Sequence, residues 1–139
     1  LLELAKQAFV KVDPRFRAEC EILEQNDLLD LMSREGKAPG GYQYGLEDIR
    51  LPFIFANAVG THADLQTLLH EGGHAFHSLL CRDEPLTAYR HSPIEFAETA
   101  SMSMELMALL PTAGESIMAI RPMSVGPFLI SMRASFKVR

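Results

Sequence analysis

The residues with the clearest chemical potential are His70-Glu71-Gly72-Gly73-His74, an HExxH pattern. On an α-helix, residues four apart lie about 40° apart around the axis, so both imidazoles share one face. Two neutral imidazoles on one face can bind a zinc ion. Glu71 is turned about 100° from His70, so it can flank the metal and act as general base on a water molecule. The motif therefore predicts a zinc site with a catalytic carboxylate.

The helix that carries this motif is predicted over about residues 62–81. Thr61-x-x-Asp64 is a capping-box variant that can start it. Stepping about 100° per residue places the leucines of this segment opposite the two motif histidines. His77 falls on the histidine side. The apolar face of this helix is expected to pack in the core, and the histidines lie on the opposite face. Core packing therefore does not explain the histidines.

Two consecutive glycines, Gly72 and Gly73, stand in the interior of the predicted helix. Each costs about 1 kcal/mol relative to alanine, so something must approach the backbone closely there, with substrate as one candidate. The alternative to a metal site is a chance HExxH match in a structural helix, since the chain contains five histidines.

A catalytic zinc usually takes three protein ligands, so a third must come from another element. A second helix is predicted over about residues 93–110, begun by a Ser-Pro pair. It carries Glu95, Glu98 and Glu105, whose spacing puts them on one face. Glu95 also fits a capping box, which favours the other two. The residues alone do not choose among the three, and an exposed acidic stripe is the alternative.

The remaining elements are predicted from periodicity and from glycine and proline positions. Helices are expected over residues 1–12 and from Asp13-Pro14 to about residue 32, followed by a loop over 39–45. Residues 51–58 read as an edge strand because a proline stands near their start. The fold class is therefore mainly α. A single domain is expected over residues 1–110, with a tail of uncertain structure at 111–139.

Composition excludes several other classes of protein. The 139 residues are 47% hydrophobic and 22% charged, with a formal net charge of −5 and no basic cluster that would indicate nucleic-acid binding. No apolar run approaches the roughly 20 residues of a membrane span, and no signal peptide is visible. Cys20 and Cys81 are far apart, which fits a reducing, cytoplasmic location. The chain starts with Leu instead of Met, which indicates a piece of something longer. Nothing in the sequence indicates an oligomeric state.

Three segments together resemble one family of zinc peptidases. PGGYQYG, LPFIFANAVGTHADLQTLLHEGGHAFHSLL and SPIEFAETASMSMEL are similar to the thimet oligopeptidase and oligoendopeptidase F family. That family has a Gly-Thr-x-x-Asp start before its HExxH helix and a Phe-x-Glu-x-x-Ser segment on the next helix. The resemblance covers about residues 39–107, with weaker similarity back to residue 13.

The resemblance implies a role for each site residue. His70 and His74 match the zinc-binding histidines, Glu71 matches the general base and Glu98 matches the third ligand, for one zinc ion per chain. His77 matches a residue that is not usually a ligand, so packing or a supporting hydrogen bond is expected of it. The implied fold is zincin-like, with two active-site helices and a short edge strand or hairpin before the HExxH helix. Glu105, Gly72 and Gly73 stay candidates for supporting the site or contacting substrate.

The implied activity is zinc-dependent endopeptidase action on short peptides. An extended peptide could pair with residues 51–58, and the 39–45 loop could border the cleft. Members of the family are several times longer than this chain and form a helical bowl around a deep channel. They also supply a Tyr and a His from a later segment, which has no match here, and the resemblance stops at about residue 110. The alternative is a catalytically incomplete fragment that binds metal or peptide without turnover.

Overall fold

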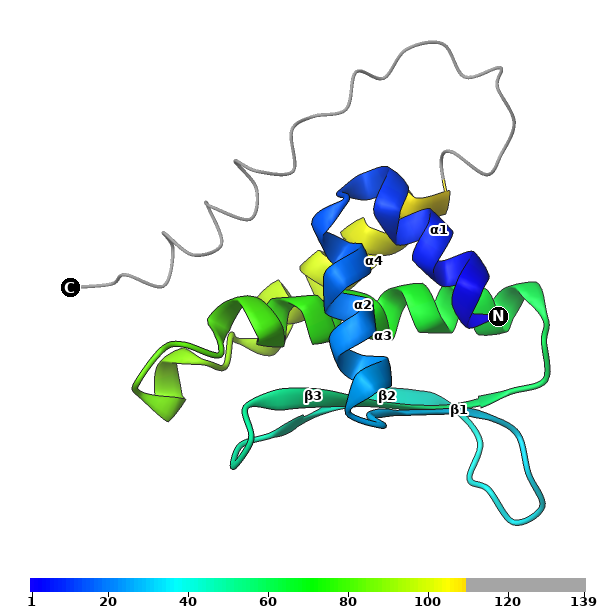
Figure 1. Cartoon of the computed structure of the whole chain (residues 1–139), viewed down its shortest axis with the longest axis horizontal. Coiled ribbons are helices and arrows are strands. Elements are labelled where there is room, and N and C mark those ends of the chain that lie inside the picture. Colours follow the sequence, from blue (N-terminus) through cyan, green and yellow to red (C-terminus); the bar gives the residue numbers. More distant parts are fainter. Residues whose placement is uncertain (110–139) are drawn as a thin grey trace, which may run out of the picture.

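The computed structural model describes residues 1–109, so the tail expected at 111–139 lies outside the described residues. A small three-stranded sheet forms one layer, and the helices lie on one side of it (Figure 1). In chain order the elements are α1 (Leu2–Val12), α2 (Arg15–Gln25), β1 (Leu29–Met32), β2 (Gly41–Leu46), β3 (Leu51–Ala58), α3 (His62–Cys81), the 3-10 turn η1 (Thr87–Tyr89) and α4 (Ile94–Leu109). The prediction of a mainly α fold with two long helices after a hairpin is confirmed.

The predicted edge strand at 51–58 is instead the centre of the sheet, so that expectation was wrong. The strand order is β1-β3-β2, with β1 parallel and β2 antiparallel to β3. Ile54 N–H donates to Leu28 O, so the N–H groups of alternate β3 residues face β1. Pro52 lies two residues before Ile54, and β1 does not extend that far. Its missing N–H therefore removes no bond between the two strands, and proline is tolerated in a central strand.

Helix α2 ends at Gln25, seven residues before the predicted end near residue 32. Asp27 takes a left-handed backbone conformation with φ 55°, which Asp tolerates better than most residues. Leu28 N–H then donates to Leu23 O and Asp27 N–H to Glu24 O, a Schellman-type closure. The residues after this stop form β1, a strand that sequence periodicity did not reveal.

Strand β2 occupies most of the segment predicted as a loop. Its side chains alternate, with Tyr42 and Tyr44 exposed and Gln43 turned to the helix side. Gly41 is required by close packing, because a Cβ there would lie 2.5 Å from Thr67 Cγ2 on α3. Glycine-rich sequence thus marks the site where a strand approaches a helix.

Helix α3 lies on the sheet and is held by the other helices from above (Figure 1). Its start is the predicted capping box, in which Asp64 N–H donates to Thr61 Oγ1 and Thr61 N–H donates to Asp64 Oδ2. Phe76 of α3 stacks on Phe16 with ring centroids 4.4 Å apart and meets Phe9 edge-on at 4.7 Å. This aromatic cluster joins α1 and α2 to α3, so α3 is a central part of the core.

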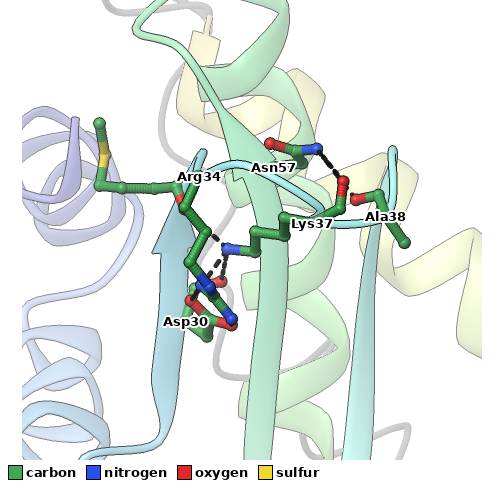
Figure 2. A network of polar contacts seen from close by, with 6 residues as sticks. Asp30, Arg34, Lys37, Ala38 and Asn57 are labelled. Carbon is green, nitrogen blue, oxygen red and sulfur yellow. Dashed lines mark hydrogen bonds and ion pairs between the residues drawn. The ribbon is translucent and has the colours of Figure 1, made fainter.

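Residues 33–40, between β1 and β2, are anchored by a polar network that Figure 2 shows. Lys37 Nζ donates to Asp30 Oδ1 at 2.9 Å and to Met32 O at 2.9 Å, although its side chain is only 1% exposed. Arg34 pairs with the same carboxylate at 2.6 Å. Asn57 Nδ2 donates to Lys37 O and Ala38 O. We call these six residues the Lys37 network; it fixes the path of the chain into β2.

Cys20, in the described part of the chain, is a buried free thiol. Among residues 1–109, no helix has both the length and the hydrophobicity that a membrane crossing requires.

Candidate metal centre

The site is assembled where α4 packs along α3. Gly73 makes this contact close, because a Cβ there would lie 2.8 Å from Ser101 Cα. Gly72 faces the other way, and its added Cβ would lie 2.3 Å from Phe9 Cζ. The close approach expected at the two glycines is therefore made by α4 and by an aromatic ring. Packing explains both glycines without a substrate contact.

Three side chains from the two helices converge at one point. His70 Nε2 and His74 Nε2 lie 3.2 Å apart, and their rings meet edge-on. Glu98 of α4 places one carboxylate oxygen 3.2 Å from His70 Nε2 and the other 3.6 Å from His74 Nε2. One ligand atom from each of the three residues lies within 4.8 Å of the others. We call His70, His74 and Glu98 the metal cluster.

Glu105 contacts the opposite nitrogen of His70. Its Oε1 lies 2.6 Å from His70 Nδ1, one of the shortest contacts of the site. A carboxylate at Nδ1 favours the proton there, which leaves Nε2 with a free lone pair directed at the cluster. Glu98 and Glu105, two turns apart on α4, therefore contact the two nitrogens of one imidazole.

Glu71 lies beside the metal cluster and is buried, with 8% of its surface exposed. Burial raises the pKa of its carboxyl, while His70 and a hydrogen bond from the Gln43 backbone N–H act in the opposite direction. The edge strand β2 thus positions this carboxylate. The role of Gln43 has no signal in the sequence, because any residue except proline could supply a backbone N–H.

The electrostatics of His74 favour the neutral imidazole. Burial lowers its pKa, and the neighbouring His70 lowers it further. Neutral imidazole is the form that binds metal ions. Two imidazole nitrogens and a carboxylate are a donor set typical of a catalytic zinc site, so these residues fit such an ion.

An open hollow adjoins the cluster on the side of β2. Its lining residues are Gly41, Ala63, Gln66, Thr67, His70, Glu71 and Glu105. The expectation that the 39–45 segment borders the cleft is met through Gly41. A molecule in this hollow would contact Glu71 and His70 together.

Two other predicted residues lie outside the cluster. Glu95 is exposed in the first turn of α4 and is not part of it. His77 lies one turn beyond His74 and is also outside it; burial lowers its pKa, and the charges of His74 and His91 add to this. Helical spacing did not choose among Glu95, Glu98 and Glu105 as the third ligand. In the structure, Glu98 lies near the Nε2 atoms of both histidines and Glu105 lies near Nδ1 of His70.

Comparison with known proteins gives relatives over most of the chain. The sequence profile of peptidase family M3 matches residues 16–119, a longer stretch than the 39–107 expected from the motifs. Chromosomal oligoendopeptidase F of Lactococcus lactis subsp. cremoris is 39% identical over 77 residues, which are 55% of this chain and 13% of that protein. The group B oligopeptidase PepB of Streptococcus agalactiae is 35% identical over 77 residues, again 13% of its length.

Solved structures agree with these relatives. PZ peptidase A, determined with an inhibitor, superposes with a TM-score of 0.72 at 34% identity, over 77% of this chain and 19% of its own. An oligoendopeptidase F structure from Bacillus anthracis str. Ames gives a TM-score of 0.72 at 36% identity, over 77% of this chain and 20% of its own. The chain thus spans about a fifth or less of the relatives it matches. With the profile match over residues 16–119, these likenesses show that the chain belongs to peptidase family M3.

Proposed function

We propose that this chain carries the zinc-binding and catalytic centre of a metalloendopeptidase that hydrolyses short peptides. The observation that carries the proposal is the convergence of His70, His74 and Glu98 beside the buried carboxylate of Glu71. The names of the relatives, oligoendopeptidase F and oligopeptidase PepB, support peptides as the substrate class.

The metal cluster would hold one zinc ion through the two Nε2 atoms and the Glu98 carboxylate. When bound, zinc supplies Lewis acidity, which polarises the scissile carbonyl and makes water more acidic. Glu105 would hold His70 in the correct tautomer through the contact at Nδ1.

Glu71 is the proposed general base. Its raised pKa makes it a stronger proton acceptor than an exposed glutamate. It would take a proton from the attacking water and deliver it to the leaving amine. The hydrogen bond from Gln43 N–H would keep the carboxylate oriented during both transfers.

The peptide would lie along β2. Both edges of β3 are occupied, by β1 and β2, so the earlier idea of pairing with residues 51–58 does not hold. In the described part of the chain, the outer edge of β2 carries no strand. Backbone pairing there would place an extended peptide next to Glu71.

The decisive experiment compares wild type with Glu71→Gln on an internally quenched peptide, with zinc content measured by elemental analysis. We expect one zinc per chain in both proteins and a fall in hydrolysis of about 10² to 10⁴-fold in Glu71→Gln. Glu21→Gln, an exposed change on α2, is the matched control. Zinc binding without turnover in wild type would favour the incomplete-fragment alternative, and absence of zinc would reject the metal site.

A further inference from the structure

A second hollow lies at the far end of β2 from the one beside His70. Three segments line it: the β2–β3 turn with Glu47 and Arg50, the end of α3 with Ser78 and Arg82, and the loop before α4 with Arg90 and His91. Its volume is about 40 Å³. We call it the arginine pocket.

The arginine pocket has an excess of positive charge. Three arginines line it against a single carboxylate, in a chain whose formal net charge is −5. Both oxygens of Glu47 are engaged, one with Arg90 Nη2 at 2.8 Å and the other with His91 Nε2 at 2.7 Å. Arg90 Nε is buried and has no hydrogen-bond partner within the described residues. The pocket therefore retains unmet donor capacity.

The other two arginines make no short ion pair with a carboxylate within residues 1–109. Arg50 Nη1 donates to the backbone oxygen of Arg82 at 3.2 Å. Arg82 Nε lies 3.9 Å from Asp83 Oδ1, whose side chain is 84% exposed. A purely structural role accounts for Arg90, which ties the β2–β3 turn to the loop before α4 through Glu47 and Glu84 O. It accounts for one donor of Arg50, which binds Arg82 O, and it does not account for the guanidinium of Arg82.

The arginine pocket and Glu71 are both in contact with strand β2. Ser78 donates to His74 O and accepts from the Gln43 side chain, so β2 and α3 stay in contact between the two places. Gln43 contacts Glu71 through its backbone N–H, and Leu46 lines the pocket. From Gln43 to Leu46 the strand advances three residue steps, about 10 Å. A peptide extended along β2 would place a group about three residues from its scissile bond in the pocket.

We propose that the arginine pocket binds a carboxylate of the peptide, either its C-terminal group or an Asp or Glu side chain. Guanidinium groups bind carboxylates through paired, charge-assisted hydrogen bonds, and a carboxylate has the size and charge that this pocket accepts. The position of the peptide rests on the proposed function above. The pocket would make the enzyme select peptides with negative charge at a fixed distance from the cleaved bond.

Fluorescence anisotropy with labelled heptapeptides of neutral side chains tests this on the full chain. The two members of the first pair differ only at the C-terminus, which is a carboxylate in one and an amide in the other. In the second pair both peptides are C-terminal amides, and one has Glu where the other has Gln. This second pair is made several times, with the Glu or Gln at a different position each time. We expect one acid member to bind about tenfold tighter than its neutral partner. Arg50→Gln and Arg82→Gln should each remove most of that preference, while the exposed Arg17→Gln should keep it. The two pairs distinguish the C-terminal from the side-chain carboxylate.

Circular dichroism confirms that each variant is folded, and each titration is run in EDTA and in zinc. A preference that persists in EDTA and depends on Arg50 and Arg82 supports the pocket even if no turnover or zinc binding is found. Equal binding of acid and neutral peptides, or no binding of any peptide, overturns the proposal. A preference that needs zinc and survives both arginine substitutions also overturns it, because the carboxylate would then be binding the metal.

Discussion

The metal cluster and the Lys37 network are two polar groups of this small fold, and they differ in how their charges and electron-pair donors are paired. In the Lys37 network each charge meets its opposite: the Asp30 carboxylate lies 2.9 Å from Lys37 Nζ and 2.6 Å from Arg34 Nη1. In the metal cluster, two imidazole nitrogens 3.2 Å apart meet a carboxylate, so electron-pair donors face one another.

Exposure does not separate the two groups, because Arg34 of the Lys37 network is 61% exposed and its Asp30 partner 29%. Lys37 is 1% exposed, and its ammonium also lies over the Phe55 ring at 4.6 Å. The side chains of His70 and Glu98 are 24% and 42% exposed. The difference lies in the charges. The Lys37 network pairs each of its cations with a carboxylate of its own, whereas the converging electron-pair donors of His70, His74 and Glu98 are completed by a cation.

Removing a histidine of the metal cluster should have the largest effect. We expect His74→Ala to abolish the stabilisation by zinc, which is about 2.7 kcal/mol when free zinc is 100 times its Kd. Thermal unfolding with zinc and with EDTA measures it. His62→Ala, an exposed change at the start of α3, should keep the full shift. If zinc raised the unfolding temperature of His74→Ala as much as that of wild type, His74 would not be a zinc ligand, and the contrast between the two polar groups would be wrong.

The contact at the far nitrogen of His70 should have a smaller effect on the same quantity. Glu105→Gln keeps the shape of the side chain and removes its charge, so zinc affinity should fall about 10 to 100-fold. Competition with a fluorescent chelator gives the affinity. Glu95→Gln, on an exposed turn of the same helix, is the control. An equal loss of zinc affinity in Glu105→Gln and Glu95→Gln would mean that Glu105 acts only through the total negative charge of the helix and not through its contact with His70.

The Lys37 network should show the reverse pattern. Lys37→Met keeps much of the volume but removes the donor to the part-buried Asp30 O and Asp30 Oδ1, so the free energy of unfolding should fall by about 1–3 kcal/mol. Urea unfolding measures it, with Lys11→Met as the exposed control. Zinc affinity of the folded protein should stay the same. A large loss of zinc affinity in Lys37→Met would show that the two groups are coupled.

The smallest expected effect is a pH dependence of the folding stability, caused by Glu19, which belongs to neither polar group. Burial raises the pKa of Glu19 from 4.5 to about 7, and its Oε2 has no hydrogen-bond partner within the described residues. The folded state therefore holds this proton more tightly than the unfolded state. The resulting stability is complete below pH 4.5 and is lost as the pH rises through about 7.

Glu19→Gln should remove this dependence. At about pH 8 the variant should be more stable than wild type by roughly 1 kcal/mol, a figure reduced for the partial exposure of Glu19. Near pH 4.5, where Glu19 is protonated in the folded protein, the gain should vanish. Chemical unfolding at the two pH values measures it, with Glu21→Gln as control. The same gain at both pH values would contradict the assignment.

Local sequence determined α3 and half of the site. The Thr61–Asp64 capping box, the apolar spacing and the four-residue interval between His70 and His74 act within one helix, so they are readable without a fold. The close packing at Gly72 and Gly73 was also readable, because glycine is costly inside a helix.

Tertiary structure decided what depends on contacts distant in the sequence. Sheet order places β3 in the centre, which is compatible with Pro52 because that residue lies beyond the reach of β1, and it makes β1 and β2 the edge strands. The packing of α4 on α3 brings Glu98 to both Nε2 atoms and Glu105 to Nδ1, a difference that helical spacing could not resolve because both glutamates share a face. The Gln43 backbone N–H on Glu71 carries no side-chain signal at all, so only the folded chain reveals it.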